Sequence, residues 1–261
     1  MRIHLVNLKR RPDRLAAMTA QLDRLGLSFE RFDAVDARTA DPKELGARFA
    51  ASGPLGALSA GDMACTMSHL SLWRAIAAGT DSHAVILEDD ILISDAAPKF
   101  LLSADWIPRG VGLIKLERYG DANQLIVIGR RRIPALDRQI APLLSRHTGS
   151  GGYVISRETA AALAGLKEKF TLPIDHLLFN PNNSPIFHWL KPWQLLPAIV
   201  DQRVEVGGAT DIHHTRQSAK PKGMALVRRQ LVRNYYDVRL IPRQAAAVLS
   251  GRARLVKIRM A

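Results

Sequence analysis

The chain has 261 residues, enough for one large domain with a substantial hydrophobic core. Apolar residues make up 47% of it, as in ordinary water-soluble proteins, and no apolar run approaches the roughly 18–20 residues of a membrane-spanning helix. The apolar stretch at residues 3–8 is also too short for a secretory signal peptide. Cys65 is the only cysteine, which excludes an intrachain disulfide and fits a reducing cytoplasm.

The net charge is +13, from 37 Lys and Arg residues against 24 Asp and Glu residues. Such an excess attracts an anionic partner, which could be nucleic acid, a lipid surface or a phosphorylated substrate. The positive charge is concentrated at the end of the chain, because residues 228–261 contain nine Arg or Lys residues and a single acid, Asp237.

The apolar pattern predicts strands and helices that alternate along the chain. Strands are expected at residues 2–8, 28–35, 83–88, 111–117, 124–128, 153–156, 186–190 and 194–200. Helices are expected at about 12–26, 61–78 and 157–168, with a loop-rich insertion at 37–56 and a short amphipathic segment after Pro173. Gly79 is expected to end the second helix in a left-handed conformation. The alternation predicts an α/β sandwich with a mainly parallel sheet.

Three consecutive acids follow the strand expected at residues 83–88. Glu88, Asp89 and Asp90 come directly after an apolar run, at the edge of an α/β sheet where ligands usually bind. Alternation along an extended chain would place Glu88 and Asp90 on one side and Asp89 on the other. Two oxygen ligands on one side suit Mg²⁺ or Mn²⁺, whereas the alternative interpretation is a solvated acidic turn.

Two further segments have both a structural and a functional interpretation. The glycine-rich loop at residues 149–152 does not have the spacing of a dinucleotide or P-loop motif. It is either a tight turn that needs positive φ or a place where the backbone approaches a substrate. Asp175 lies in an apolar segment, where it is either a helix-start aspartate or a base held in a cleft.

Two histidines are also open to two interpretations. His69 lies four residues before Trp73, on the same helical face, and is either a core residue or part of a site. His213 belongs to an adjacent histidine pair, which is either a surface feature or the source of one metal ligand beside Glu88 or Asp90.

Five short segments in order resemble glycosyltransferase family 25, the bacterial lipooligosaccharide galactosyltransferase-like proteins. The resemblance covers residues 3–179, about two thirds of the chain. The segments that carry it are Leu5-Val6-Asn7-Leu8 with Arg10 to Arg14, Gly61 to Cys65 with Ser68-His69-Leu70 and Trp73-Arg74, Leu87 to Asp90, Gly151-Gly152-Tyr153 with Ile155-Ser156, and Pro173-Ile174-Asp175.

This resemblance implies a GT-A-like fold over residues 1–214, in which a Rossmann-type half binds a nucleotide sugar. Asp90 then becomes the direct Mn²⁺ or Mg²⁺ ligand, with Glu88 reaching the ion through water or contacting the ribose. His213 lies beyond the segments that carry the resemblance and stays a candidate metal ligand on the residues alone. Asp175 takes the position of the base that activates the acceptor. The residues implied in donor binding are Asn7, Arg11, Arg14, His69, Glu88, Gly151 and Gly152.

The implied reaction is a metal-dependent transfer of a hexose with inversion. A divalent ion neutralises the departing nucleoside diphosphate, and one base with no evident second nucleophile favours a single displacement. The resemblance favours galactose from UDP-galactose as the donor, and a lipooligosaccharide or another glycan, free or lipid-linked, as the acceptor.

Residues 215–261 are interpreted as a basic helical tail. Apolar residues recur there at helical spacing beside arginines, which suits docking on an anionic membrane at the inner face of the plasma membrane, and Pro242 divides the tail into two segments. The alternative for the tail is an ordinary packed helix followed by a disordered end.

Two other functions remain open. One is a non-catalytic basic module that binds nucleic acid or membrane, although no nucleic-acid motif is recognisable. The other is a metal-dependent phosphatase or nucleotidyltransferase that uses the same carboxylates.

Overall fold

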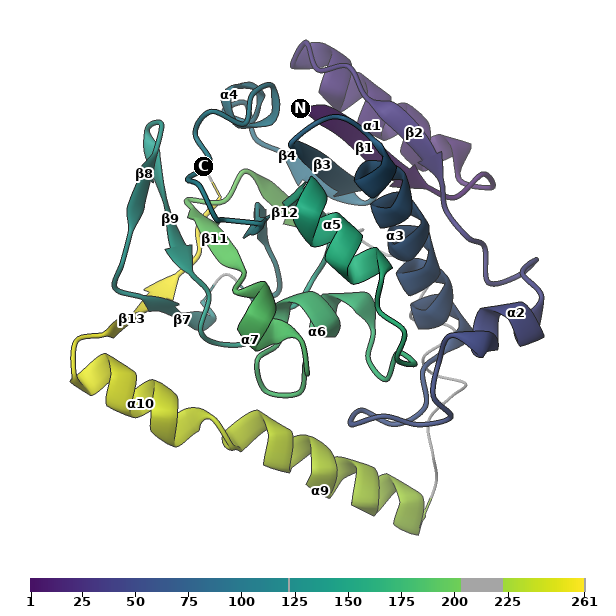
Figure 1. Ribbon diagram of the computed structural model, residues 1–261, viewed down its shortest axis with the longest axis vertical. Coiled ribbons are helices and arrows are strands. Elements are labelled where there is room, and N and C mark those ends of the chain that lie inside the picture. Colours follow the sequence, from purple (N-terminus) through teal and green to yellow (C-terminus); the bar gives the residue numbers. More distant parts are fainter. Residues whose placement is uncertain (122, 203–222, 261) are drawn as a thin grey trace.

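The structure is a computed structural model that describes residues 1–121, 123–202 and 223–260 (Figure 1). Its centre is an eight-stranded sheet. In spatial order the strands are β2 (Glu30–Asp33), β1 (Arg2–Asn7), β3 (His83–Glu88), β10 (Gly152–Ser156), β5 (Leu113–Lys115), β11 (Trp193–Leu196), β9 (Arg138–Pro142) and β8 (Ile133–Ala135). All strands except β10 and β9 point the same way, because only these two are antiparallel to both of their neighbours.

Two smaller sheets flank the large one. One contains β4 (Ile91–Ile93), β12 (Val200–Gln202) and β6 (Glu117–Arg118), and the other pairs β13 (Ala253–Lys257) with β7 (Leu125–Gly129). The helices are α1 (Pro12–Arg24), α2 (Pro42–Ala47), α3 (Ala60–Ala78), α4 (Pro98–Leu101), α5 (Arg157–Ala164), α6 (Ile174–Phe179), α7 (Phe187–Leu190), α9 (Met224–Val238) and α10 (Ile241–Leu249). This confirms the predicted α/β sandwich.

Helices cover both faces of the large sheet, and the alternation along β3 divides its side chains between two hydrophobic clusters. Ile86 packs with α3, α5, α6 and α7 on one face. Val85 and Leu87 pack with α1 and α4 on the other. Burial on both faces explains why β3 reads as a continuous apolar run in the sequence. The acids that follow this run therefore emerge at the edge of a rigid core.

Helix α3 is fixed at its start by a capping box. The Ser59 hydroxyl accepts a hydrogen bond from the Asp62 amide, while the Asp62 carboxylate accepts one from the Ser59 amide. The helix ends at Gly79, whose φ is −80°, so the left-handed cap predicted there is wrong. The Gly79 amide instead donates to the Ile76 carbonyl, and the chain leaves the helix in an extended conformation.

Two other expectations need correction. The segment 186–190, predicted as a strand, instead contains a helical turn, α7, at Phe187–Leu190. Ile186, Phe187 and Leu190 are buried while His188 and Trp189 are exposed, which is the spacing of a helix face and not strand alternation. The insertion at residues 37–56, predicted as loop, contains α2, which begins after an aspartate cap and a proline.

The end of the chain is helical in its first part and a strand in its last. Helices α9 and α10 run along the outside of the molecule below α6 and α7 (Figure 1). Strand β13 then pairs with β7 along its whole length, and Ile258 is buried in the core. The expectation of a disordered end is therefore wrong. The predicted division at residue 214/215 falls in residues 203–222, outside the described part of the chain, and stays a prediction.

Candidate active site

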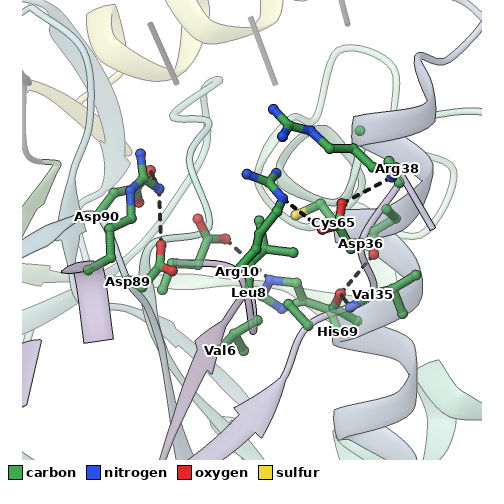
Figure 2. Close-up of a pocket in the computed structure, with 17 residues that line it drawn as sticks. Val6, Leu8, Arg10, Val35, Asp36, Arg38, Cys65, His69, Asp89 and Asp90 are labelled. Carbon is green, nitrogen blue, oxygen red and sulfur yellow. Dashed lines mark hydrogen bonds and ion pairs between the residues drawn. The ribbon is translucent and has the colours of Figure 1, made fainter. Parts of the chain in front are cut away.

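A pocket opens where β1 and β3 end, at the start of α3 (Figure 2). This is the sheet edge at which the sequence predicted a ligand site. The acidic triplet lines one side, and arginines approach from the loops that follow β1 and β2. Among the residues that line the pocket are Arg10, Arg14, Arg38, Cys65, His69, Glu88, Asp89 and Asp90.

The acidic triplet does not continue the strand. Glu88 is the last residue of β3, and residues 89 and 90 form a turn before β4. Arg14 Nη1 lies 3.1 Å from Asp89 Oδ1 and 3.3 Å from Asp90 Oδ2, so both aspartates share one guanidinium. The predicted placement of Asp89 on the opposite side from Asp90 is therefore wrong, because strand alternation ends at Glu88.

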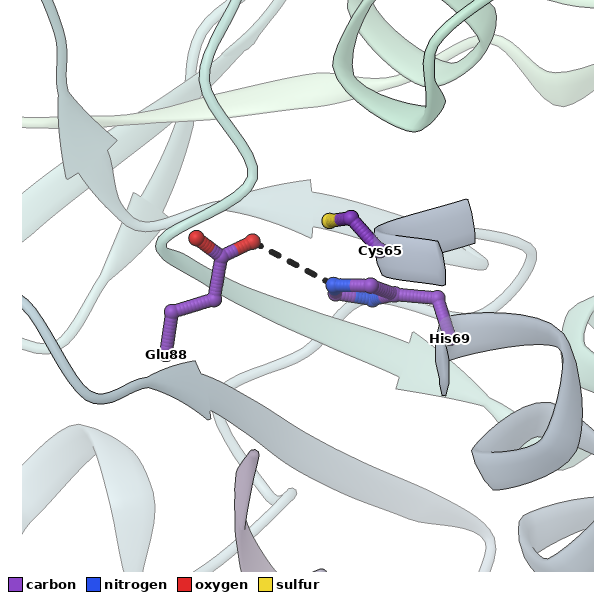
Figure 3. A group of neighbouring side chains, drawn as sticks. All are labelled: Cys65, His69 and Glu88. Carbon is purple, nitrogen blue, oxygen red and sulfur yellow. Dashed lines mark hydrogen bonds and ion pairs between the residues drawn. The ribbon is translucent and has the colours of Figure 1, made fainter. Parts of the chain in front are cut away.

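Glu88 is held by hydrogen bonds from two directions. His69 Nε2 lies 3.2 Å from its Oε1 atom, as Figure 3 shows, and the Ser150 hydroxyl donates to the same oxygen at 2.6 Å. Burial alone would raise the pKa of Glu88, but the hydrogen bond and charge interaction with His69, together with the Ser150 hydrogen bond, outweigh burial and hold its pKa below the usual value. Glu88 is therefore a fixed anion at the pocket wall.

A chain of buried hydrogen bonds orients His69. The Trp73 indole N–H donates to the Tyr153 hydroxyl at 3.0 Å, and that hydroxyl lies 2.7 Å from His69 Nδ1. Indole can only donate, so the arrangement that uses every group has Tyr153 donating to Nδ1 and His69 Nε2–H donating to Glu88. His69 is fully buried, and its ring nonetheless reaches the pocket acid. His69 is thus a core residue that also lines the pocket, while donor binding by His69 stays a prediction.

Cys65, His69 and Glu88 form a group of possible metal ligands within 4.8 Å of one another (Figure 3). Burial, with the charges of Glu88 and Asp175, raises the pKa of the Cys65 thiol well above its usual value. Metal binding here would need the thiol to lose its proton and His69 to lose the hydrogen that it gives to Glu88. The carboxylates of Glu88 and Asp90 are the alternative donors, and oxygen ligands suit a hard cation.

The pKa of Asp90 is shifted by burial and by the neighbouring carboxylates. Burial, reinforced by the charge of Glu88, raises the pKa of Asp90 to about 7 against the opposing effect of Arg14. Asp89 has its pKa raised by burial as well, although Arg14 and Asn7 counteract it. Several carboxylates in one partly buried place repel each other, and a divalent cation relieves such repulsion. These residues therefore fit the Mn²⁺ or Mg²⁺ that the sequence predicted.

Asp175 lies in the same region, although it is 85 residues from the triplet in the sequence. It stands in the first turn of α6, and its Oδ2 atom accepts a 3.4 Å hydrogen bond from the Gly149 amide. Its negative charge contributes to the raised pKa of Cys65 and opposes the lowering of the pKa of Glu88. The structure thus brings the predicted base and the predicted metal ligands together.

The predicted donor-binding residues of the first loop have different surroundings. Asn7 is buried and bonded to the protein itself, because its amide donates to Asp89 and to the Arg11 carbonyl while its oxygen accepts from Arg31. The Arg11 side chain pairs with Asp13, 2.7 Å away. Arg14 lines the pocket and so remains the strongest of the three as a donor-binding prediction.

Sequence reasoning missed two arginines of the pocket. Arg10 lines it and pairs with Asp36 at 2.7 Å, and Arg38 lines it beside them (Figure 2). Arg10 belonged to a basic run after the first strand, so its position was a usable signal, whereas Arg38 lay in an apparent loop. His213, predicted as a metal ligand, lies outside the described residues.

A family model described as "Glycosyltransferase family 25 (LPS biosynthesis protein)" matches residues 1–178 of the chain. The chain belongs to glycosyltransferase family 25. This confirms the resemblance that the motifs indicated, and the matched range contains the acidic triplet, the glycine-rich loop and Asp175.

Several curated relatives share this family 25 region. Lipooligosaccharide biosynthesis protein lic2B of Haemophilus influenzae is 30% identical over 139 residues, 50% of this chain and 52% of that protein. A glycosyltransferase 25 family member of Drosophila melanogaster is 31% identical over 194 residues, 68% of this chain and 30% of that protein. LgtB of Neisseria gonorrhoeae, named for lacto-N-neotetraose biosynthesis, is 25% identical over 222 residues, 78% of this chain and 75% of that protein.

The chain spans about half the length of the first of these relatives. Among solved structures, an active-site mutant of LgtC aligns with 88% of this chain and 100% of that one, at 11% identity and a TM-score of 0.40. So distant a likeness has no bearing on the substrate of this family 25 chain.

Asp90 gives a prediction about stability and pH. Its pKa is about 7 in the folded protein against 3.8 as the ordinary value, so between those pH values the folded state holds a proton that the unfolded state has lost. Asp90 therefore weakens the metal-free fold as pH rises through this range, by up to about 1.4 kcal/mol per pH unit. We expect Asp90→Asn to raise Tm at about pH 8 in the presence of chelator, with the gain shrinking toward about pH 4. A Tm difference that is the same at every pH would contradict the assignment.

Proposed function

We propose that this family 25 chain is a metal-dependent glycosyltransferase that moves a hexose from a nucleotide sugar to a glycan acceptor with inversion. The observation that carries the proposal is that Glu88 and Asp90 line a pocket together with arginines, while Asp175 in α6 is close enough for its charge to act on Glu88. Each side chain has a role that a sugar transfer requires.

The metal proposal rests on the carboxylates. Asp90, with Glu88 beside it, would hold Mn²⁺ or Mg²⁺, and the ion would neutralise charge on the diphosphate leaving group. Arg14 already shares its guanidinium with Asp89 and Asp90, so it keeps these acids in place and brings positive charge to the same wall. Arg10 and Arg38 add positive charge at the opposite side, where a diphosphate would be attracted.

Asp175 is the proposed general base. A partly buried carboxylate near the pocket can accept the proton of an acceptor hydroxyl as that oxygen attacks the anomeric carbon. The Gly149 amide hydrogen bond orients one carboxylate oxygen. A single base suffices for one displacement, which inverts the configuration at the anomeric carbon.

The substrate proposals come from the relatives. Names that refer to lipooligosaccharide and lacto-N-neotetraose biosynthesis support a lipid-linked saccharide as the acceptor. We propose galactose from UDP-galactose as the donor, in agreement with the resemblance stated from the sequence. A lipid-linked acceptor would place the enzyme at the inner, cytoplasmic face of the plasma membrane.

Helix α9 offers a surface for that membrane. Its exposed apolar side chains recur at intervals of three and four residues and so form one stripe. They are Met224, Val227, Leu231, Tyr235 and Val238, each more than half exposed. The helix is joined to the body beside this stripe, because Asp237 pairs with Arg146 at 2.7 Å. Val232, which lies next to Leu231 in the sequence, is partly buried and does not belong to the stripe.

The charge around this stripe favours an anionic lipid surface. Arg239 and Arg243 are exposed at the junction of α9 and α10, beside Ile241, which is 53% exposed. Basic residues next to an exposed apolar face suit a helix that lies in the headgroup region, and each cation near the surface adds about 1 kcal/mol. None of the helices in the described parts of the chain has both the length and the apolarity to cross a bilayer.

The proposed transfer reaction can be tested by measuring release of the nucleoside diphosphate. Purified protein with Mn²⁺ should release UDP from UDP-galactose in the presence of a galactosyl acceptor glycan, and Asp90→Ala should lose nearly all of this activity while keeping its circular dichroism spectrum. Phosphoester hydrolysis without an acceptor would favour the phosphatase alternative. Full turnover by a folded Asp90→Ala protein would remove the metal role.

The second prediction concerns the base. Asp175→Asn keeps the shape of the side chain but cannot take up the acceptor proton, so transfer should slow by about 10²–10⁴-fold. Donor binding, measured by calorimetric titration, should stay close to the wild-type value. If donor binding weakens while the single-turnover rate is preserved, Asp175 is not the base.

The third prediction concerns the membrane surface. A variant with Leu231, Tyr235 and Val238 all changed to Gln should lose flotation with anionic liposomes, and the wild type should float less at high salt or on neutral lipid. The matched control changes Leu102 and Leu136, exposed to a similar degree elsewhere, to Gln. We use substitutions because removing the chain from α9 onward would also remove β13, which pairs with β7. Equal flotation of both variants would show that the stripe on α9 does not bind the membrane.

A further inference from the structure

We infer that a buried ion pair, Lys115 with Glu117, is a positioning element that sets the place of Glu88 relative to Asp175. The inference rests on the proposed roles of those two acids. Lys115 Nζ donates to Glu117 Oε2 at 2.6 Å, and the two side chains are 0% and 1% exposed. Neither residue belongs to the sequence motifs that indicated the family.

The pair supports the glycine-rich loop from below. Lys115 also donates to the Gly149 carbonyl, and Glu117 accepts a 3.1 Å hydrogen bond from the Gly151 amide. The two charges thus hold the backbone on both sides of Ser150. A buried backbone amide or carbonyl needs such a partner, because no water is there to form a hydrogen bond with it.

The loop approaches the pair so closely that only glycine fits. Gly149 has a φ of +92°, and a Cβ atom there would lie 2.8 Å from Glu117 Oε2. At Gly151 a Cβ atom would lie 3.0 Å from Glu117 Oε1 and 2.8 Å from Ile91 Cγ2. The space beside this loop is therefore filled by the protein's own side chains. The structural interpretation of the loop, a tight turn that needs positive φ, is confirmed at Gly149, while donor contact by Gly151 and Gly152 stays a prediction.

The loop held by Lys115 and Glu117 contacts both Glu88 and Asp175. Ser150 donates its hydroxyl to Glu88, the Gly151 carbonyl accepts from the Glu88 amide at 2.9 Å, and the Gly149 amide donates to Asp175. Three consecutive loop residues thus connect the proposed metal-site acid to the proposed base. A shift of the loop would move Glu88 and Asp175 relative to each other.

Lys115 reaches the base by a second route. Its ammonium lies 4.6 Å from the centre of the Phe179 ring, at the end of the helix that begins beside Asp175. A desolvated cation over an aromatic face is attracted to it. The one ammonium therefore contacts the loop, the strand acid Glu117 and helix α6, and so connects the three segments whose relative placement matters for transfer.

The test compares Lys115→Met with Lys99→Met. Lys99 makes the same kinds of contact on the surface, an ion pair with Asp137 at 2.6 Å and a ring contact with Phe100, so its loss controls for removal of a paired lysine. We expect Lys115→Met to speed amide hydrogen exchange at residues 149–151 and to lower kcat by about 10–100-fold per folded molecule, because misplacement by about 1 Å costs about that much. KM for the donor should change by less than about threefold, and Lys99→Met should match the wild type.

A second variant keeps the inference testable if Lys115→Met fails to fold. Lys115→Met with Glu117→Gln removes both charges, so no unpaired ion is buried, and the Gln oxygen can still accept from the Gly151 amide. Exchange at Gly149 should still be faster and kcat still lower than in the wild type. Wild-type exchange and wild-type kcat with only a lower Tm would overturn the inference. If the wild type transfers no sugar at all, the proposed function fails, while the exchange measurement still decides the role of the pair.

Discussion

The site depends on one constraint, which is that a carboxylate at the end of a buried strand needs hydrogen-bond partners from the protein. Glu88 meets it with partners from two separate segments, His69 on α3 and Ser150 in the glycine-rich loop. Each partner is itself fixed by buried groups, the Tyr153 and Trp73 pair on one side and the Lys115 and Glu117 pair on the other. The rigidity of the pocket wall is thus a consequence of satisfying one acid.

The elements around the site were largely predictable because their signals are local. The strand that ends at Glu88 and the helix that carries His69 follow from hydrophobic spacing over a few residues, and the three acids mark the sheet edge by their position alone. Errors occurred where several spacings fit a short apolar run, as at residues 186–190, or where a turn began inside a motif, as at Asp89 and Asp90.

The supporting groups could not be predicted, because their contacts are distant in sequence. Lys115 reads as one polar residue in an apolar strand, and nothing nearby indicates that its ammonium meets the Gly149 carbonyl, 34 residues away. The same holds for Tyr153, whose partner His69 is 84 residues away. Residue types and order indicated the candidate acids, whereas the side chains that hold them became visible only in three dimensions.

The pairing of β13 with β7 has a mechanical consequence for the end of the chain. Strand β13 follows α10 after only a few residues and pairs with β7 along its whole length. Helix α10 is therefore not a flexible tether. A lipid plane bound by the adjacent α9 would instead set the tilt of the entire domain and the direction in which the pocket faces. With the proposed lipid-linked acceptor, the two partners would then meet by lateral diffusion in two dimensions, and the rate would follow the surface density of that acceptor rather than its bulk concentration.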